Sequence, residues 1–188
     1  MACWTYLLRR RNSSIMGVIE STNGAFRSGQ KEAVPAFLAG AFSLALLGGA
    51  WAFQYLGGLA PCEMCIWQRW PHGTAIILGL GTGILALNRV LPRDTVKALT
   101  WLAIAAIAIS GAIGVFHAGV EWQLWNGPDA CTGIGFVPGQ STTFQVVRCD
   151  EAQWRLLGIS LAGYNAIFSL AMAAWLGGLM ARKASPAQ

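Results

Sequence analysis

Charged side chains are scarce in this sequence. Only 11% of its 188 residues are Asp, Glu, Lys or Arg, while 55% are hydrophobic. A soluble globular domain usually carries about 25% charged residues, so this composition excludes an ordinary soluble protein. The hydrophobic residues form long blocks instead of alternating with polar ones. A helix needs about 20 residues to cross a bilayer, and several blocks reach that length.

Other features are also missing. No Gly-x-Gly-x-x-Gly pattern follows a strand, so we expect no bound nicotinamide. Arg9-Arg10-Arg11 has no apolar core after it, which disfavours a signal peptide. We therefore expect residues 1–34 to be a poorly ordered cytoplasmic tail, in which Met16 is a second candidate start. The net charge of +5 does not indicate nucleic-acid binding, because its distribution has a better explanation.

The apolar blocks predict an all-α integral membrane protein, a four-helix transmembrane bundle with two short periplasmic loops and cytoplasmic termini. A backbone in lipid must bond its amides internally, so each block is expected to be a helix. One domain over 35–181 holds the spans, and a short tail covers 182–188. The expected spans are about 36–59, 70–87, 98–118 and 156–180. Glycines inside them are expected to let helices approach closely: Gly48, Gly49, Gly79, Gly81, Gly83, Gly111 and Gly114.

Basic residues predict the orientation. Ten of the thirteen Lys and Arg residues fall in the two tails or in the loop between the second and third blocks. Since basic loops stay in the cytoplasm, both termini are predicted to be cytoplasmic. Four of the five cysteines then face outward, into the periplasm of a bacterium with two membranes, where disulfides persist. Cys3 remains inside, where we expect an inert thiol.

The first outward pair is Cys62 and Cys65, in a Cys-x-x-Cys motif between the first two blocks. The motif often lowers the pKa of one thiol, and the thiolate is the reactive species. Arg69 follows Cys65 by four residues, which places both on one helical face if the helix begins nearby. The alternatives are a zinc site built from all four outward cysteines and a pair of structural disulfides.

The second outward pair is Cys131 and Cys149, in the one long polar loop. A disulfide between them is expected to be exposed and its loop flexible, which makes such a bond easily attacked by another protein. The residues alone leave the connectivity open, because four cysteines allow three full pairings.

Together these features resemble the disulfide bond formation protein B (DsbB) family. The resemblance spans about Pro35 to Met180. It includes Pro61-Cys62-x-x-Cys65 with Gln68-Arg69, His117 with Glu121-Trp122, the second cysteine pair, and Trp154-Arg155-Leu156-Leu157-Gly158 at the start of the fourth span.

The resemblance implies a quinone-linked thiol oxidase of the bacterial inner membrane. Its partner is expected to be a periplasmic thioredoxin-fold dithiol oxidase resembling DsbA, which forms a mixed disulfide with Cys131. Cys149 then attacks Cys62, and Cys65 leaves as a thiolate beside a quinone, either ubiquinone or menaquinone. Arg69 stabilises the charge there.

Two histidines are further candidates for quinone contact. The resemblance implies that His117 lies near the quinone head. His72, in the first predicted turn of the second span, is a candidate for the same pocket. Contact with lipid headgroups is the alternative for both histidines and for Arg69.

Two other functions remain open. Vitamin K epoxide reductases also join four spans to paired cysteines and a quinone, but their Cys-x-x-Cys comes late in the chain, whereas here it follows the first span. A related oxidoreductase with another partner or direction is the closer alternative. The other is a membrane scaffold with structural disulfides. The partner, the quinone type and the oligomeric state are not determined by the sequence.

Overall fold

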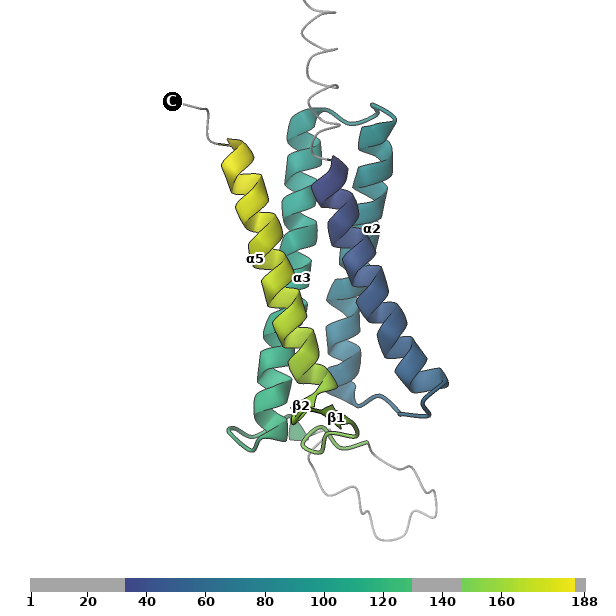
Figure 1. The fold of residues 1–188 in the computed structure, drawn as a ribbon, viewed down its shortest axis with the longest axis vertical. Coiled ribbons are helices and arrows are strands. Elements are labelled where there is room, and N and C mark those ends of the chain that lie inside the picture. Colours follow the sequence, from purple (N-terminus) through teal and green to yellow (C-terminus); the bar gives the residue numbers. More distant parts are fainter. Residues whose placement is uncertain (1–32, 130–146, 185–188) are drawn as a thin grey trace, which may run out of the picture.

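Four antiparallel helices form the body of the protein in a computed structural model, which describes residues 33–129 and 147–184 (Figure 1). The first helix covers Ala33–Tyr55. The others are α2 (Glu63–Leu87), α3 (Arg93–Glu121) and α5 (Leu161–Ala184). All four are long and apolar enough to cross a membrane. The prediction of a four-helix transmembrane bundle is therefore confirmed.

The second helix starts earlier than the sequence indicated. The prediction began it near Trp70, with Pro71 in the first turn, but α2 begins at Glu63 and contains Pro71. Proline was interpreted as a helix start, although membrane helices tolerate it internally when other groups satisfy the freed carbonyl. Cys62 is the N-cap, since its Sγ accepts a hydrogen bond from the Cys65 amide at 3.2 Å.

The bounds of the other spans also differ. The first helix ends at Tyr55 instead of Leu59, because Gly58 has a φ of 67° that no helix accommodates. Helix α3 begins at Arg93, five residues before the predicted Ala98, because its charged first turn is helical despite its polarity.

A small hairpin replaces the predicted start of the fourth span. Strand β1 (Arg155–Leu156) pairs antiparallel with β2 (Ile159–Ser160), and α5 begins only at Leu161. Between the strands, Leu157 and Gly158 have φ values of 52° and 82°. Two successive positive φ values form a tight hairpin turn and prevent a helix at this point.

Helix packing depends on glycines at two close contacts. A Cβ on Gly79 would lie 2.5 Å from the Gly40 nitrogen, so the first helix and α2 touch backbone to backbone. A Cβ on Gly114 would lie 3.0 Å from the Ala162 carbonyl oxygen, at the contact between α3 and α5. Gly83 and Gly111 also lie against neighbouring helices. The same role was predicted for Gly48, Gly49 and Gly81, but a Cβ there meets nothing within 4 Å.

The main core is made largely of small side chains from all four helices. Small residues suit a membrane bundle, because helices in lipid associate through close packing and not through a hydrophobic driving force. Its buried members are Ala39, Ala75, Ala103, Ile104, Ala106, Ile107, Ala173, Leu176 and Met180.

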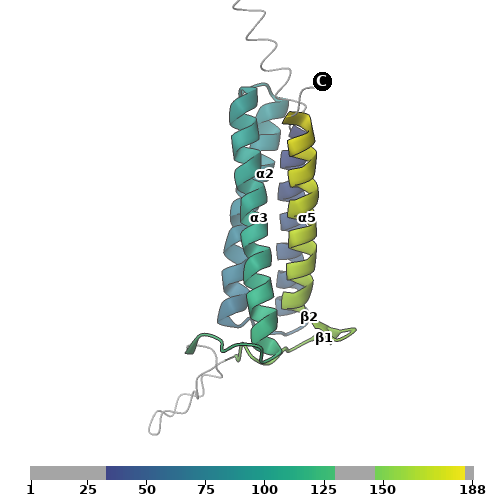
Figure 2. The same cartoon turned by 90° about the vertical axis from the view of Figure 1, so that its left-hand side faces the viewer.

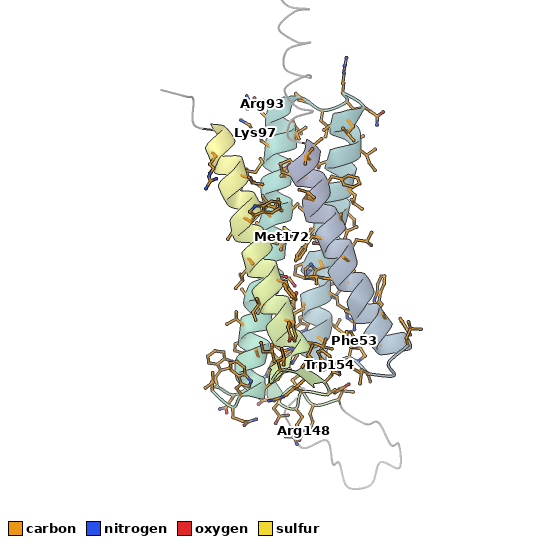
Figure 3. All side chains as sticks on the ribbon, viewed as in Figure 1. Phe53, Arg93, Lys97, Arg148, Trp154 and Met172 are labelled. Atoms are coloured by element: carbon orange, nitrogen blue, oxygen red, sulfur yellow. The ribbon has the colours of Figure 1, made fainter. Side chains whose placement is uncertain are left out.

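The two ends of the bundle differ in character. Figure 3 shows Arg93 and Lys97 at the end where α5 finishes, and Arg148, Trp154 and Phe53 at the opposite end. Figure 2 shows the hairpin β1–β2 at that second end as well. The Cys62–Cys65 motif forms the N-cap and first turn of α2 at this end, opposite the basic loop. The arrangement agrees with the predicted topology, although residues 1–32 and 185–188 lie outside the described part.

We predict that Gly79→Ala destabilises the bundle by about 1–3 kcal/mol, because the added methyl group meets backbone atoms that cannot move aside. Gly81→Ala on the same helix is the matched control, since its Cβ points into open space. The measurement is thermal unfolding in detergent. Equal midpoints for the two variants would contradict the close contact.

Candidate functional site

The two cysteines of the Cys-x-x-Cys motif form a dithiol at the start of α2. Both thiols are free, and their sulfur atoms lie 2.7 Å apart, with Cys62 donating to Cys65. Cys62 is only 4% exposed, whereas Cys65 is half-buried. The hydrogen bond to Cys65, together with burial, raises the pKa of Cys62. Cys62 therefore keeps its proton, and Cys65 is the sulfur better placed to carry negative charge.

Cys149 lies against this dithiol. It is fully buried in a cluster with Cys62, Met64 and Val120. It is also disulfide-bonded, and because Cys62 and Cys65 are free, its bonding partner lies outside the described residues. Cys131 is outside them too. The sequence predicted that the second disulfide is exposed, but its Cys149 side has 0% exposure.

Contacts between the two loops keep Cys149 in place. The Gln153 amide donates to the Ala60 carbonyl at 2.8 Å, which ties the second loop to the segment before Cys62. Arg148 and Asp150, the neighbours of Cys149, pair with each other at 2.9 Å. As a result, Cys149 already lies beside Cys62.

A cavity of about 500 Å³ opens beside the dithiol. One wall comes from the first helix, where Gly49 leaves room that a side chain would fill, and another comes from the first turns of α5. In Figure 1 the ribbons of these two helices diverge toward this end. Its lining is mostly apolar, with a few polar side chains near the sulfur of Cys65, a composition typical of small-molecule sites.

Aromatic rings line the side of the cavity away from α3. The rings of Phe53 and Trp154 have centroids 5.1 Å apart, and Tyr164 follows at 6.3 Å from Trp154. Figure 3 shows Phe53 and Trp154 side by side at this end of the bundle. These rings offer a flat apolar face to a planar ligand.

Arg69 also lines the cavity, one turn after Cys65 on α2. Its guanidinium donates to the Gln54 side chain of the first helix at 2.6 Å. It is half-buried, and this contact holds it toward the protein instead of toward lipid headgroups. The predicted shared face of Cys65 and Arg69 therefore fits the helix that the structure contains.

His117 is buried beside Cys62 and bonded on both ring nitrogens. Gln68 donates to its Nδ1 at 2.8 Å, and its Nε2 lies 3.6 Å from Cys62 Sγ. The ring also hydrogen-bonds to the backbone of Cys149. With 2% exposure, His117 has no contact with lipid headgroups, which was the alternative for it. Its position joins α2, α3 and the second loop around the sulfur atoms.

A second polar group continues this network deeper into the bundle. His72 contacts Ser43 at 3.2 Å and Asn165 at 2.9 Å, so it is bonded within the protein. Asn165 donates to Gln68 at 2.7 Å, which joins the two histidines in one chain of hydrogen bonds. Ser110 donates to the Gln68 carbonyl at 2.9 Å. His72 also lines the cavity, as the sequence predicted.

Glu121 lies at the loop-facing end of this polar network. Its side chain is 5% exposed, lines the cavity, and has Oε1 3.7 Å from His117 Nε2. Its Oε2 has no hydrogen-bond partner among the described residues. A buried carboxylate with an unused oxygen is costly, so it marks a functional candidate.

Two ligand classes can be compared with this geometry. Cys62, Cys65 and His117 present three possible metal ligands within 4.8 Å of one another. A structural zinc site is closed by four protein ligands, whereas these three leave one position open, and the positive charge of Arg69 on the same wall disfavours a cation. The apolar cavity with Arg69 at the thiols instead fits a planar, electron-accepting ring.

Three site residues were not predicted from the sequence as members of the site. Gln68 and Glu121 were named only as parts of the motifs that carry the resemblance, and Asn165 was assigned to packing across helices. Asn165 does bond across helices, but to the groups that hold His117 and His72. A polar residue inside or at the end of an apolar block is itself a signal of function, and it applies to all three.

The fold and the site define a multi-pass membrane protein that carries a reactive cysteine pair at one end. Comparison with known proteins agrees. The family described as disulfide bond formation protein DsbB matches residues 32–179, and the chain belongs to this family.

Curated relatives carry the same description. Disulfide bond formation protein B of Xylella fastidiosa (strain 9a5c) is 30% identical over 141 residues, covering 70% of this chain and 80% of that protein. The protein of the same name from Paracidovorax citrulli is 28% identical over 163 residues, covering 80% and 88%. No solved structure matches the chain.

We predict that Asn165→Ala lowers stability by about 1–2 kcal/mol, because it leaves the Gln68 oxygen Oε1 and the His72 nitrogen Nε2 without a partner in a buried place. Ser169→Ala is the control, since it removes only one bond to the same Asn165. Thermal unfolding in detergent measures both. An Asn165 variant as stable as the Ser169 variant would show that the network is not shared in this way.

Proposed function

We propose that this protein reoxidises a periplasmic thioredoxin-fold dithiol protein and passes the two electrons to a membrane quinone. The observation that carries the proposal is the buried contact between Cys149 and the Cys62–Cys65 dithiol, at the wall of an apolar cavity. Two exchangeable cysteine pairs in contact form a relay, because thiol–disulfide exchange needs direct attack of sulfur on sulfur.

The burial of Cys149 determines which sulfur the partner attacks. With 0% exposure, the sulfur of Cys149 is inaccessible to a thiolate of another protein. The attack therefore falls on the other sulfur of its disulfide, which we assign to Cys131. That attack forms a mixed disulfide with the partner and releases Cys149 as a thiolate.

Cys149 then attacks the oxidised inner pair at Cys62, its neighbour in the cluster. Cys65 leaves as a thiolate on the cavity side. A second attack by the partner's remaining thiol frees Cys131. Cys131 then attacks Cys149, which reforms the outer disulfide, and Cys62 leaves, so that the inner pair becomes a dithiol. Two electrons and two protons have then moved from the partner to Cys62 and Cys65.

The cavity residues prepare the inner pair for its oxidation. A bound quinone, ubiquinone or menaquinone, supplies a two-electron, two-proton acceptor. Arg69 places a fixed positive charge on the cavity wall one turn from Cys65, which favours the thiolate and any negative charge that develops beside it. His117 and His72 also line the cavity, where hydrogen bonds to Gln68 and Asn165 hold their rings in place.

The location follows from the same reasoning. The reaction needs an oxidising compartment for the thiols and lipid for the acceptor, and the cysteine-bearing end opposes the basic loop of Arg93 and Lys97 (Figure 3). We place the protein in the bacterial inner membrane with this end in the periplasm. A scaffold with structural disulfides is disfavoured, because Cys62 and Cys65 are free thiols beside a cavity.

We predict quinone-dependent oxidation when the purified protein is mixed with a reduced thioredoxin-fold dithiol protein and a short-chain quinone. Cys65→Ser stops turnover, because the inner pair no longer forms, whereas Cys3→Ser leaves it unchanged. Quinone absorbance and thiol titration measure the reaction. A wild-type protein that oxidises no dithiol in the presence of quinone would refute the proposal.

We predict a new visible absorption band when quinone is added to a Cys62→Ser variant, since Cys65 is then an unpaired thiolate at the cavity. Arg69→Ala abolishes the band, because the charge that favours the thiolate is lost. Gln54→Ala is the control: it removes the contact to Arg69 but keeps the charge. A band that persists in Arg69→Ala at equal quinone occupancy would contradict this role of Arg69.

A further inference from the structure

Closing the inner disulfide requires that Cys62 lose a proton in a buried place. Cys62 is the hydrogen-bond donor of the pair and is 4% exposed. Bulk water therefore has little access to its proton. When the Cys62 sulfur bonds to the Cys65 sulfur, the S–H bond of Cys62 breaks, and a group inside the protein must accept the proton.

His117 is the nearest polar side chain, but its hydrogen bonds prevent it from accepting. The Gln68 nitrogen Nε2 lies 3.2 Å from the Met64 carbonyl oxygen. Because a carbonyl oxygen only accepts hydrogen bonds, the amide atom facing it must be the donor nitrogen and not the amide oxygen. The same Nε2 faces His117 Nδ1, so Nδ1 carries no proton. The neutral ring therefore holds its proton on Nε2, the nitrogen that faces Cys62.

The backbone of Cys149 agrees with this tautomer. His117 hydrogen-bonds to that backbone, and a protonated Nε2 donates to a carbonyl oxygen. With Nδ1 occupied by Gln68 and Nε2 already protonated, His117 is a fixed donor. It orients the groups around Cys62 but takes no proton from it.

Glu121 is the group that remains. Its carboxyl group lies 3.7 Å from the same His117 Nε2, lines the same cavity, and is close enough for its charge to act on both Cys62 and Cys65. Its Oε2 has no partner among the described residues, so a lone pair is free to accept. The other groups facing it are donors, Arg155 of β1 and Ser160 of β2.

We propose that Glu121 is the proton acceptor for Cys62 when the inner disulfide closes. The place of this proton transfer in turnover rests on the function proposed above. The proton passes from Cys62 to the carboxylate directly or through one water. Glu121 becomes a carboxylic acid as the S–S bond forms, and it then releases this proton to the reduced acceptor in the cavity. Because Cys65 is already a thiolate, the second proton of the acceptor comes from water.

The proposal is testable without quinone. A small aromatic disulfide such as dithiodipyridine reacts with the reduced inner pair in two phases. The half-buried Cys65 attacks first and releases one thiopyridone. Cys62 then attacks the Cys65 sulfur, closes the inner disulfide and releases the second thiopyridone. The second phase requires the same loss of the Cys62 proton as the natural reaction, and it is followed by absorbance in quinone-free detergent.

The background for this test is a protein with Cys3, Cys131 and Cys149 replaced by Ser, so that only the inner pair reacts. In Glu121→Gln we expect the second phase to slow at least about tenfold near neutral pH, since a positioned base contributes about 10²–10⁴-fold. The first phase does not slow, because loss of the Glu121 charge does not disfavour the Cys65 thiolate. Glu63→Gln, an exposed carboxylate next to Cys62, is the matched control and leaves both phases unchanged.

The pH dependence separates proton transfer from a structural effect. The carboxylate accepts only when ionised, so the second phase of the background protein rises as Glu121 ionises and then levels off. In Glu121→Gln that rise is lost, and the rate increases only at high pH, where Cys62 ionises by itself. Glu121→Asp restores part of the rate and the plateau.

Several outcomes overturn the proposal. An unchanged second phase in Glu121→Gln does so, as does a background protein whose pH profile lacks the plateau. If Glu121→Gln does not fold, the profiles of the background protein and Glu121→Asp decide alone. If the wild-type protein reduces no quinone but the second phase depends on Glu121, the proposed function fails and the role of Glu121 stands.

Discussion

The bilayer allows no buried polar group to go without a partner, and the site of this protein depends on that constraint. Gln68, Asn165 and His72 lie inside apolar helices, where an unpaired amide or imidazole is costly. They satisfy one another across α2 and α5 and connect to His117 of α3 beside Cys62. The same bonds that make these residues tolerable in lipid also fix the side chains around the dithiol.

Helix packing supplies the second requirement, an open space beside the sulfur atoms. The first helix and α2 touch at Gly40 and Gly79, and α3 approaches α5 at Gly114. The cavity lies at the cysteine-bearing end, where Gly49 has no neighbour within 4 Å. Small residues therefore have two opposite uses in one bundle. Gly40, Gly79 and Gly114 permit contact between helices, whereas Gly49 has no side chain to fill the cavity that it lines.

The electrostatics of the site follow from the way each group is held. Arg69 is tied to Gln54, so its charge stays at the cavity. His117 is bonded on both nitrogens, and one oxygen of Glu121 has no hydrogen-bond partner within the described ranges. A cation, a neutral donor and a carboxylate thus surround two thiols of unequal burial. This asymmetry is what allows one sulfur to carry charge while the other retains its proton.

By itself, the sequence determined the number of spans and the place of the cysteine motif between the first two, and it predicted their direction, because length, apolar blocks and basic loops act locally along the chain. Only the tertiary structure decided that Cys149 is buried against Cys62, that Pro71 lies inside α2, and that Glu121 and Asn165 belong to the site. These facts depend on contacts between residues far apart in the chain, and on which neighbour satisfies a polar group once water is excluded.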